Sequence, residues 1–285
     1  MCAKIEHMKK KQLTIVIPAY NEETRLPPTI KKVLQWADQT TVFDIELIIV
    51  DDGSGDRTRD LVREFADKDS RVRLIEETHV GAMHAILAGF QAARYPLVGN
   101  MDADCAVHPK AYEALLPFVH ETGIAQGSRI LRGGLRPVAK SILRKFLSWC
   151  FLILFNALFK NQVKDPQIGF RLFRKESVLK IIPTIRLWHD GLKHGEIAIR
   201  AFGLGMTVTE IPVTYIHDED SRCLPSKKPT KAMFITIEAL VALISMWIQC
   251  SIDYQLGKLV RPVTRGSYLL WPLTLFSAKR RKRDS

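Results

Sequence analysis

The pattern that most constrains this chain is an alternation of short apolar segments with amphipathic helical segments over its first half. Helical patterns occupy residues 56–66 and 81–94. Because strands that alternate with helices form a mostly parallel sheet, the pattern predicts a Rossmann-like α/β fold with flanking helices. Four short runs are predominantly apolar, as strands covered on both faces of a sheet must be: residues 13–17, 45–50, 72–75 and 97–101.

Polar residues stand at the ends of three of these runs. Tyr20 and Glu22 follow the first run, Asp51 and Asp52 follow the second, and Asp102 follows the fourth. In open parallel sheets, ligands bind beyond the carboxyl ends of the strands. We therefore expect these side chains to lie along one edge of the sheet and to form a binding site there.

Asp102 and Asp104 are two carboxylates separated by one residue after a predicted strand. Such a pair can share a divalent cation, and hard oxygen ligands suit Mg²⁺ or Mn²⁺, which then bridges to a diphosphate. The alternative is that these aspartates only close the strand in a turn. Spacing alone does not decide between a metal site and a turn.

Charge and composition limit the classes of protein. The chain carries 42 Lys and Arg against 30 Asp and Glu, a net charge of +12, and 47% of its residues are apolar, which excludes a disordered chain. A basic chain binds nucleic acid, phospholipid or phosphorylated substrates. Nucleic acid is disfavoured, because the charge gathers around apolar segments rather than in a basic stripe with interleaved aromatic residues. The five cysteines form no CxxC pair, which indicates a reducing compartment.

The chain divides into three predicted parts. Residues 1–11 form a basic extension, residues 12–230 form one α/β domain, and residues 231–285 form an apolar helix with a basic tail. Inside the domain, residues 141–159 are rich in Leu and Phe and predict an apolar helix that docks at a membrane interface. The C-terminal part therefore predicts a membrane-associated helical segment.

The apolar segment at residues 232–250 allows three interpretations. It lies on or dips into a membrane, it crosses one with residues 268–276 returning, or it is a helix of a soluble core. Basic residues both precede it and follow it at residues 279–283, so a single crossing would violate the positive-inside bias. We expect membrane lipids as partners and a cytosolic catalytic domain, at the endoplasmic reticulum in a eukaryote or the plasma membrane in a prokaryote.

Several motifs follow one another in a fixed order, and together they resemble the family 2 glycosyltransferases. The resemblance covers residues 12–230 and is strongest to dolichyl- or polyprenyl-phosphate sugar synthases such as the mannose enzymes. It implies a GT-A nucleotide-sugar-binding fold. The motifs are Ile17-Pro18-Ala19-Tyr20-Asn21-Glu22, residues 50–56, Met101-Asp102-Ala103-Asp104, Gly127-Ser128-Arg129, residues 165–173 and residues 210–215.

The first two motifs, by this resemblance, hold the nucleoside of a nucleotide-sugar donor. Carboxylates suit this role because they accept hydrogen bonds from hydroxyl and base N–H groups. Asp51 and Asp52 also stand where they can stabilise the start of the following helix, and both roles can coexist. The implied donor-binding residues are Pro18, Tyr20, Glu22, Asp51, Asp52 and Asp102.

The later motifs imply the catalytic and phosphate-binding residues. Asp102 and Asp104 would hold Mg²⁺ or Mn²⁺ and, through it, the donor diphosphate. Arg129 and Arg171 would meet the phosphates of donor and acceptor, because a guanidinium fork fits phosphate oxygens.

Two stretches depart from the family pattern. Arg222 and Lys227 resemble an acceptor-phosphate loop with imperfect spacing, and their alternative is ordinary surface charge. The stretch Gly81-Ala82-Met83 stands where relatives carry a lysine between two glycines, and His79 or His84 is the candidate replacement.

The implied activity is an inverting transfer of a sugar, mannose being favoured, from GDP-mannose or UDP-glucose to a polyprenyl or dolichyl phosphate. A phosphate acceptor is already anionic and needs no strong base. The enzymatic alternative is a sugar hydroxyl acceptor, which would need a carboxylate base, and Asp190 and Glu196 are the candidates. A catalytically inactive partner subunit is the third possibility. The oligomeric state stays open.

Overall fold

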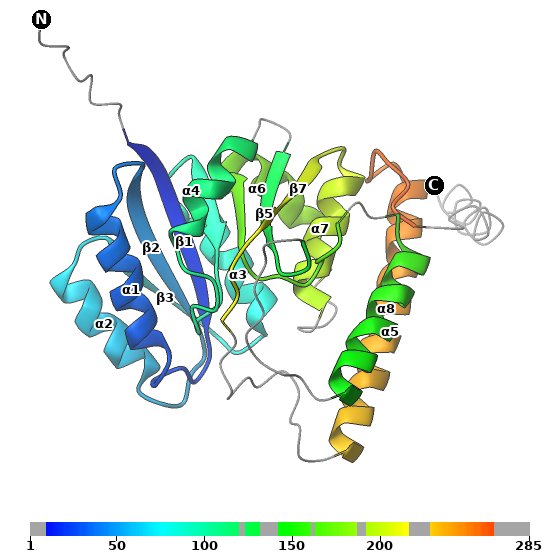
Figure 1. The fold of residues 1–285 in the computed structure, drawn as a ribbon, viewed down its shortest axis with the longest axis horizontal. Coiled ribbons are helices and arrows are strands. Elements are labelled where there is room, and N and C mark those ends of the chain that lie inside the picture. Colours follow the sequence, from blue (N-terminus) through cyan, green and yellow to red (C-terminus); the bar gives the residue numbers. More distant parts are fainter. Residues whose placement is uncertain are drawn as a thin grey trace, which may run out of the picture.

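The computed structural model describes residues 10–119, 123–131, 142–160, 163–186, 192–216 and 229–264. Within these residues, seven strands form one sheet in the order β3-β2-β1-β4-β6-β5-β7 (Figure 1). The strands are β1 Lys11–Ala19, β2 Phe43–Asp52, β3 Val72–Glu77, β4 Leu97–Asn100, β5 Gly123–Ser128, β6 Arg171–Arg174 and β7 Thr207–Pro212.

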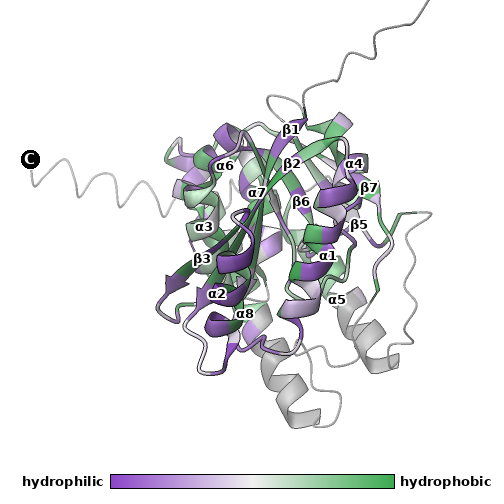
Figure 2. Cartoon of the chain, turned by 90° about the vertical axis from the view of Figure 1, so that its left-hand side faces the viewer, coloured by the Kyte–Doolittle hydropathy of each residue, from purple (hydrophilic) through white to green (hydrophobic). Residues whose placement is uncertain are grey.

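Helices cover both faces of this sheet. Residues of α1, α2 and α4 pack on one face, and residues of α3, α6 and α7 pack on the other. Figure 2 shows green strands enclosed by helices that carry purple, hydrophilic residues. The helices are α1 Leu26–Gln39, α2 Thr58–Lys68, α3 Ala82–Ala92, α4 Ala111–Leu115, α5 Ile142–Leu158, α6 Lys175–Ile181, α7 Lys193–Gly203 and α8 Pro229–Gln255, with short 3₁₀ helices at Leu116–Phe118 and Ile182–Thr184.

The predicted α/β fold with a mostly parallel sheet is confirmed. Strand β1 pairs in parallel with β2 and β4, and β2 pairs in parallel with β3. Strand β6 runs antiparallel to both β4 and β5, so the sheet is mixed on that side. The fourth predicted strand is one residue too long, because β4 ends at Asn100 and Met101 already belongs to the following loop.

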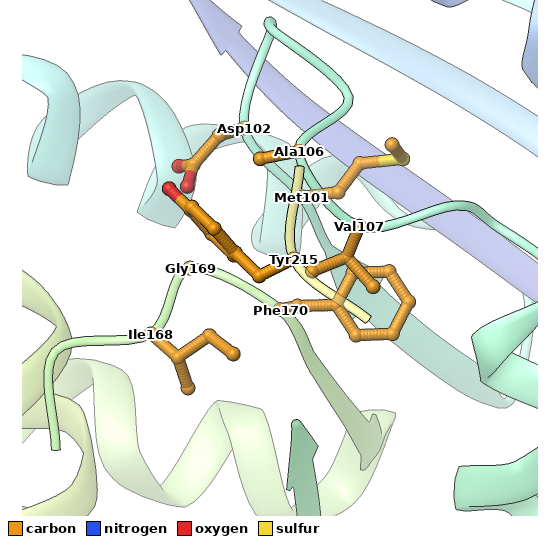
Figure 3. Close-up of a pocket in the computed structure, with 8 residues that line it drawn as sticks. All are labelled: Met101, Asp102, Ala106, Val107, Ile168, Gly169, Phe170 and Tyr215. Carbon is orange, nitrogen blue, oxygen red and sulfur yellow. The ribbon is translucent and has the colours of Figure 1, made fainter. Parts of the chain in front are cut away.

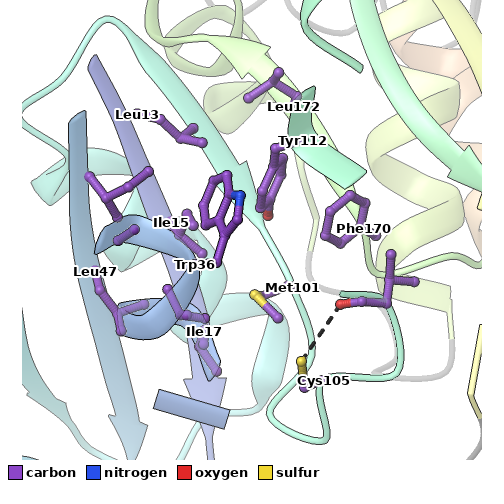
Figure 4. Close-up of a cluster of buried hydrophobic side chains, with 14 of the residues drawn as sticks. Leu13, Ile15, Ile17, Trp36, Leu47, Met101, Cys105, Tyr112, Phe170 and Leu172 are labelled. Carbon is purple, nitrogen blue, oxygen red and sulfur yellow. Dashed lines mark hydrogen bonds between the residues drawn. The ribbon is translucent and has the colours of Figure 1, made fainter. Parts of the chain in front are cut away.

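The core is divided by the sheet, because successive side chains of a strand point to opposite faces. Leu13, Ile15 and Ile17 of β1 pack toward α1, in the cluster of Figure 4. Val16 packs toward α3, where an added Cβ on Gly89 would lie 2.3 Å from Val16 Cγ1. The glycine thus lets α3 approach β1 closely. Full burial of each such aliphatic side chain stabilises the fold by about 1.5–3 kcal/mol.

Helices α5 and α8 lie side by side beyond the edge of the sheet (Figure 1). They share a third apolar cluster in which Phe155 of α5 and Phe159, the residue after α5, pack with Leu243, Met246 and Cys250 of α8. This cluster also includes Ile199 of α7 and Leu192, the residue before α7, so the helix pair is joined to the domain through α7.

No helix in the described part of the chain is long and apolar enough to span a bilayer. The membrane-associated C-terminal segment stays a prediction, as does the division of the chain near residue 230. Residues 1–9 of the basic extension and the basic tail at residues 279–283 lie outside the described residues.

Candidate active site

The loops that follow β1 and β2 are tied to each other at the carboxyl edge of the sheet. The Asn21 N–H donates to Ser54 Oγ at 2.9 Å, and the Glu22 N–H donates to Thr58 Oγ1 at 2.8 Å. The Gly55 N–H donates back to the Asn21 side chain at 2.8 Å. Asn21 has φ 53°, a left-handed conformation that Asn adopts more readily than most residues. These bonds hold the first two motifs in one fixed arrangement.

An aromatic platform lies at this edge. The rings of Tyr20 and His79 stack with centroids 4.2 Å apart and planes 20° apart. His79 Nδ1 lies 2.9 Å from Asp52 Oδ2, and the Asp52 carboxylate also accepts the backbone N–H groups of Val80 and Gly81. Tyr20 is 40% exposed. Asp52 therefore orients His79, and the exposed rings form a flat surface of the kind on which a nucleobase stacks.

Three other predicted donor-binding residues are more buried. Asp51 accepts the Ser54 N–H at 3.0 Å, and its Oδ1 atom is buried without a hydrogen bond among the described residues. Pro18 lies inside β1 beside Val50 of β2. Glu22 forms an ion pair with Arg25. These residues lie at the same edge of the sheet, but their side chains contribute to the stability of the fold at least as much as to an exposed binding surface.

The two carboxylates of Asp102 and Asp104 follow β4 in one turn. The Ala106 N–H donates to Asp104 Oδ1 at 3.1 Å. Burial, and next the negative charge of Asp102, raise the pKa of Asp104 to about 6. Two crowded carboxylates of this kind favour a bound cation, and their hard oxygens suit Mg²⁺ or Mn²⁺. Within the described residues, no group of three or more His, Cys, Asp or Glu side chains gathers at one point.

A pocket opens beside Asp102 (Figure 3). In that view the Tyr215 hydroxyl and the Asp102 carboxylate point toward each other. An added Cβ on Gly169 would lie 2.3 Å from Asp102 Oδ2, so only glycine permits this approach. The pocket is lined by Met101, Asp102, Ala106, Val107, Ile168, Gly169, Phe170 and Tyr215.

Arg129 lies at the rim of this region. Its guanidinium binds Asp165 through two hydrogen bonds of 2.8 and 2.6 Å, and its backbone N–H donates to the same carboxylate. The guanidinium also lies over the Tyr215 ring, 5.0 Å from its centroid. Arg129 is thus held in a fixed orientation near the pocket, with part of its side chain exposed.

Arg171 is placed differently from the sequence prediction of a direct phosphate contact. It has no exposed surface, and its guanidinium donates to Gln126 Oε1, to Pro166 O and to His194 O. Burial lowers its pKa to about 10, so the side chain stays charged at neutral pH. Because these donors are bonded to protein acceptors, Arg171 is placed to fix the residues around the site rather than to contact a phosphate.

Of the two candidate catalytic bases, Glu196 lies within the residues that the structure describes, and it belongs to an internal cluster of ion pairs. It accepts the Arg186 N–H at 2.9 Å and pairs with Arg200, which in turn binds Asp253 of α8. Burial raises the pKa of Glu196. His194, two residues earlier on α7, faces Asp102, so Glu196 projects about 200° away around the helix. Asp190, Arg222 and Lys227 lie outside the described residues.

Two residues that the motifs do not assign contribute to the site. The sequence offers His79 only as a replacement for a missing lysine, and it instead joins Tyr20 and Asp52. His194 carries no motif, and only the structure brings it near Asp102. The sequence signal that could have identified His79 is its position two residues after the end of β3, at the same edge of the sheet.

Relatives of stated activity match most of this chain. A dolichyl-phosphate beta-glucosyltransferase of Dictyostelium discoideum is 31% identical over 228 residues, which cover 75% of this chain and 69% of that protein. One of Trichomonas vaginalis is 31% identical over 222 residues, 73% of this chain and 65% of that protein, so the chain spans about two thirds of these relatives. An undecaprenyl-phosphate mannosyltransferase of Micrococcus luteus is 28% identical over 209 residues, 72% of this chain and 83% of that protein.

A solved structure shares the fold. Glucosyl-3-phosphoglycerate synthase of Mycobacterium tuberculosis, in complex with uridine diphosphate, superimposes with a TM-score of 0.57 over 83% of this chain and 80% of that chain. Its sequence is 17% identical, so the likeness speaks for the fold alone. The family model for glycosyl transferase family 2 matches residues 14–182, which contain the paired aspartates and the aromatic platform. The chain therefore belongs to glycosyl transferase family 2.

Proposed function

We propose that this glycosyltransferase transfers glucose from UDP-glucose to dolichyl or another polyprenyl phosphate, with inversion at the anomeric carbon. The observation that carries the proposal is that the pair Asp102 and Asp104 lies at the same sheet edge as the Tyr20–His79 platform, because they follow the neighbouring parallel strands β4 and β1. The relatives of Dictyostelium and Trichomonas support glucose and a dolichyl phosphate. The alternative sugar is mannose, which the sequence motifs favour and which the Micrococcus relative, an undecaprenyl-phosphate mannosyltransferase, supports.

The proposed roles follow from the contacts. Tyr20 and His79 stack on the base, and Asp52 keeps the His79 ring in the plane of the platform. A divalent cation held by Asp102 and Asp104 would offset the negative charge that develops on the leaving nucleoside diphosphate. The Arg129 guanidinium adds positive charge at the pocket rim, fixed by Asp165.

The acceptor phosphate is ionised at neutral pH, so the proposed reaction needs no group that removes a proton. The position of Glu196 supports this proposal, because its carboxylate is occupied by Arg186 and Arg200. Catalysis then depends on orientation and on stabilisation of charge.

The helix pair supports a lipid acceptor. The α5–α8 surface is a set of exposed apolar side chains on the side opposite the buried Leu243 and Met246. In water such a surface is unfavourable, and at a membrane interface it is buried in the headgroup region. We propose that it docks the enzyme on the cytosolic membrane face. Its residues are Trp149, Ile153, Leu240, Val241, Ile244 and Ile248.

The acceptor is tested by offering labelled donor, Mn²⁺ and one of three acceptors: polyprenyl phosphate, polyprenol or a soluble sugar. The proposal expects product only with polyprenyl phosphate. It also expects the variants Asp190→Asn and Glu196→Gln to retain turnover. Product with a hydroxyl acceptor, lost in Asp190→Asn, would instead establish the hydroxyl-acceptor alternative.

The docking surface is tested by sedimentation with vesicles that contain anionic lipid. The double variant Val241→Asp, Ile244→Asp is expected to lose vesicle binding while donor binding is kept. The matched control is Leu179→Asp, an exposed leucine of α6 outside the α5–α8 surface, which is expected to bind vesicles normally. Equal vesicle binding by the wild type, the double variant and the Leu179→Asp control would contradict membrane docking through α8.

A further inference from the structure

His194 occupies a position between the buried Arg171 and the partly exposed Asp102 of the site. It lies in the first turn of α7 and is 6% exposed. Its Nδ1 atom lies 3.2 Å from Arg171 Nη1, and its Nε2 atom lies 3.7 Å from Asp102 Oδ1. The imidazole therefore connects the buried guanidinium to one of the two carboxylates on which the proposed function depends.

The arginine determines which ring nitrogen carries the proton. A guanidinium has only donors, so Arg171 Nη1 donates and His194 Nδ1 accepts. A neutral imidazole that accepts at Nδ1 carries its proton at Nε2. Arg171 also donates to the backbone oxygen of His194 at 2.8 Å, so the same side chain fixes both the ring and the backbone of this residue.

The protonated nitrogen faces Asp102. A nitrogen that bears a proton has no lone pair for a metal, so this tautomer makes His194 a hydrogen-bond donor and not a metal ligand. The separation of 3.7 Å is longer than a hydrogen bond, and contacts of this kind tighten when substrate is bound. The side chain of Asp102 is 38% exposed, and a fixed donor beside it favours one orientation of the carboxylate.

The surroundings of His194 are rigid. An added Cβ on the next residue, Gly195, would lie 2.8 Å from Gln167 Nε2, so the start of α7 packs closely against the loop before β6. Further along α7, Arg200 is bound to Asp253 of α8. A donor carried on such a support can hold a carboxylate in one orientation, as hydrogen bonds to metal-binding carboxylates do.

We propose that His194, held by Arg171 in its Nε2-protonated form, is a positioning residue that orients the Asp102 carboxylate for the cation and diphosphate of the donor. The proposal rests on the proposed function only in giving Asp102 a metal-binding role. It assigns Arg171 to the support of His194 in place of a direct contact with phosphate.

The test compares amide replacements that reproduce one ring nitrogen each. In His194→Gln the amide reaches the position of Nε2 and can donate to Asp102, whereas in His194→Asn it reaches only the position of Nδ1. His194→Leu removes both. Mn²⁺ affinity is measured by electron paramagnetic resonance with UDP present, and with GDP in parallel. Binding of each nucleotide in EDTA verifies that every variant is folded.

The proposal expects the Asn and Leu variants to bind Mn²⁺ about 10- to 100-fold more weakly, and the Gln variant to keep most of the affinity. The control is His108→Leu, which removes an exposed imidazole that bonds only to Lys110 N among the described contacts, and it is expected to bind Mn²⁺ normally.

Equal Mn²⁺ affinity in the Asn and Gln variants, or wild-type affinity in the Leu variant, would overturn the proposal. If the Leu variant does not fold, the comparison of Asn with Gln still decides. The binding measurement needs neither sugar transfer nor a lipid, so its failure is distinct from a failure of the proposed reaction.

Discussion

Gly169 permits the close approach between the loop before β6 and the carboxylate of Asp102. In Gly169→Ala the new Cβ would lie 2.3 Å from Asp102 Oδ2 and 2.5 Å from Oδ1. Ordinary contact begins at 3.4 Å, so the carboxylate must withdraw by about 1 Å, the difference between 3.4 and 2.3. Asp102 is partly exposed, so its side chain can rotate toward solvent without disturbing the core.

A misplacement of about 1 Å in a reacting assembly lowers the rate by about 100-fold. We therefore expect kcat/KM of Gly169→Ala to fall about 100-fold, which corresponds to about 2.7 kcal/mol of transition-state stabilisation. Mn²⁺ affinity falls with it. The free energy of unfolding changes by less than about 1 kcal/mol, because no apolar side chain is removed from the core.

The matched control is Gly55→Ala, in which the nearest atom to the new Cβ is Asn21 Oδ1 at 4.0 Å. Initial rates, Mn²⁺ titration and urea unfolding are measured on both variants. Wild-type kcat/KM and Mn²⁺ affinity in folded Gly169→Ala would refute the reasoning, because the carboxylate would then not need the position that the structure gives it. An equal loss in Gly55→Ala would refute it as well.

Three further predictions concern the pH dependence, the platform and the buried ion cluster. Burial and Asp102 raise the pKa of Asp104 to about 6, so the folded protein holds the ionised carboxylate less favourably than the unfolded chain does. The resulting loss of folding stability is absent below the unfolded pKa of Asp104 and develops as pH rises through 6. Asp104→Asn in EDTA should therefore be about 1–2 kcal/mol more stable at pH 8 after allowance for solvent screening, a gain that shrinks toward pH 4 in urea titrations. Tyr20→Ala should weaken UDP binding by about 1–3 kcal/mol in calorimetry, and unchanged affinity would exclude the platform as the base site. Asp253→Ala removes the shorter of the two described ion pairs of buried Arg200, leaving the one with Glu196, and should lower the unfolding free energy by about 3–5 kcal/mol, whereas a change below about 1 kcal/mol would show that the Asp253 pair adds little.

The parallel half of the sheet could be predicted because its strands are short apolar runs separated by helical patterns. The rule that ligands bind at the carboxyl ends of parallel strands then places Tyr20, Asp52 and Asp102 at one edge, and the pairing of β1 with β2 and β4 confirms this. Strand β6 could not be predicted, because a four-residue segment bounded by two arginines has neither the length nor the apolar run of a central strand.

Burial of charged side chains explains the remaining differences. Arg171 follows a glycine-containing motif, as an exposed phosphate-binding arginine does, and nothing in the sequence indicates that Gln126 and His194 occupy its donors. Glu196 is likewise a reasonable candidate base in the sequence, where its pairing with Arg200 is not visible. His194 is a single histidine without a spacing pattern, and only the fold of α7 against β6 brings it to Asp102.

The measurement to make first is sugar transfer by the purified protein with Mn²⁺, a long-chain polyprenyl phosphate and radiolabelled UDP-glucose, with GDP-mannose in parallel. We expect label from UDP-glucose to enter the organic phase, and Asp104→Ala to abolish it. Product from GDP-mannose alone would change the donor to mannose. No lipid-linked product from either donor, in protein that binds UDP and Mn²⁺, would contradict transfer to a lipid phosphate.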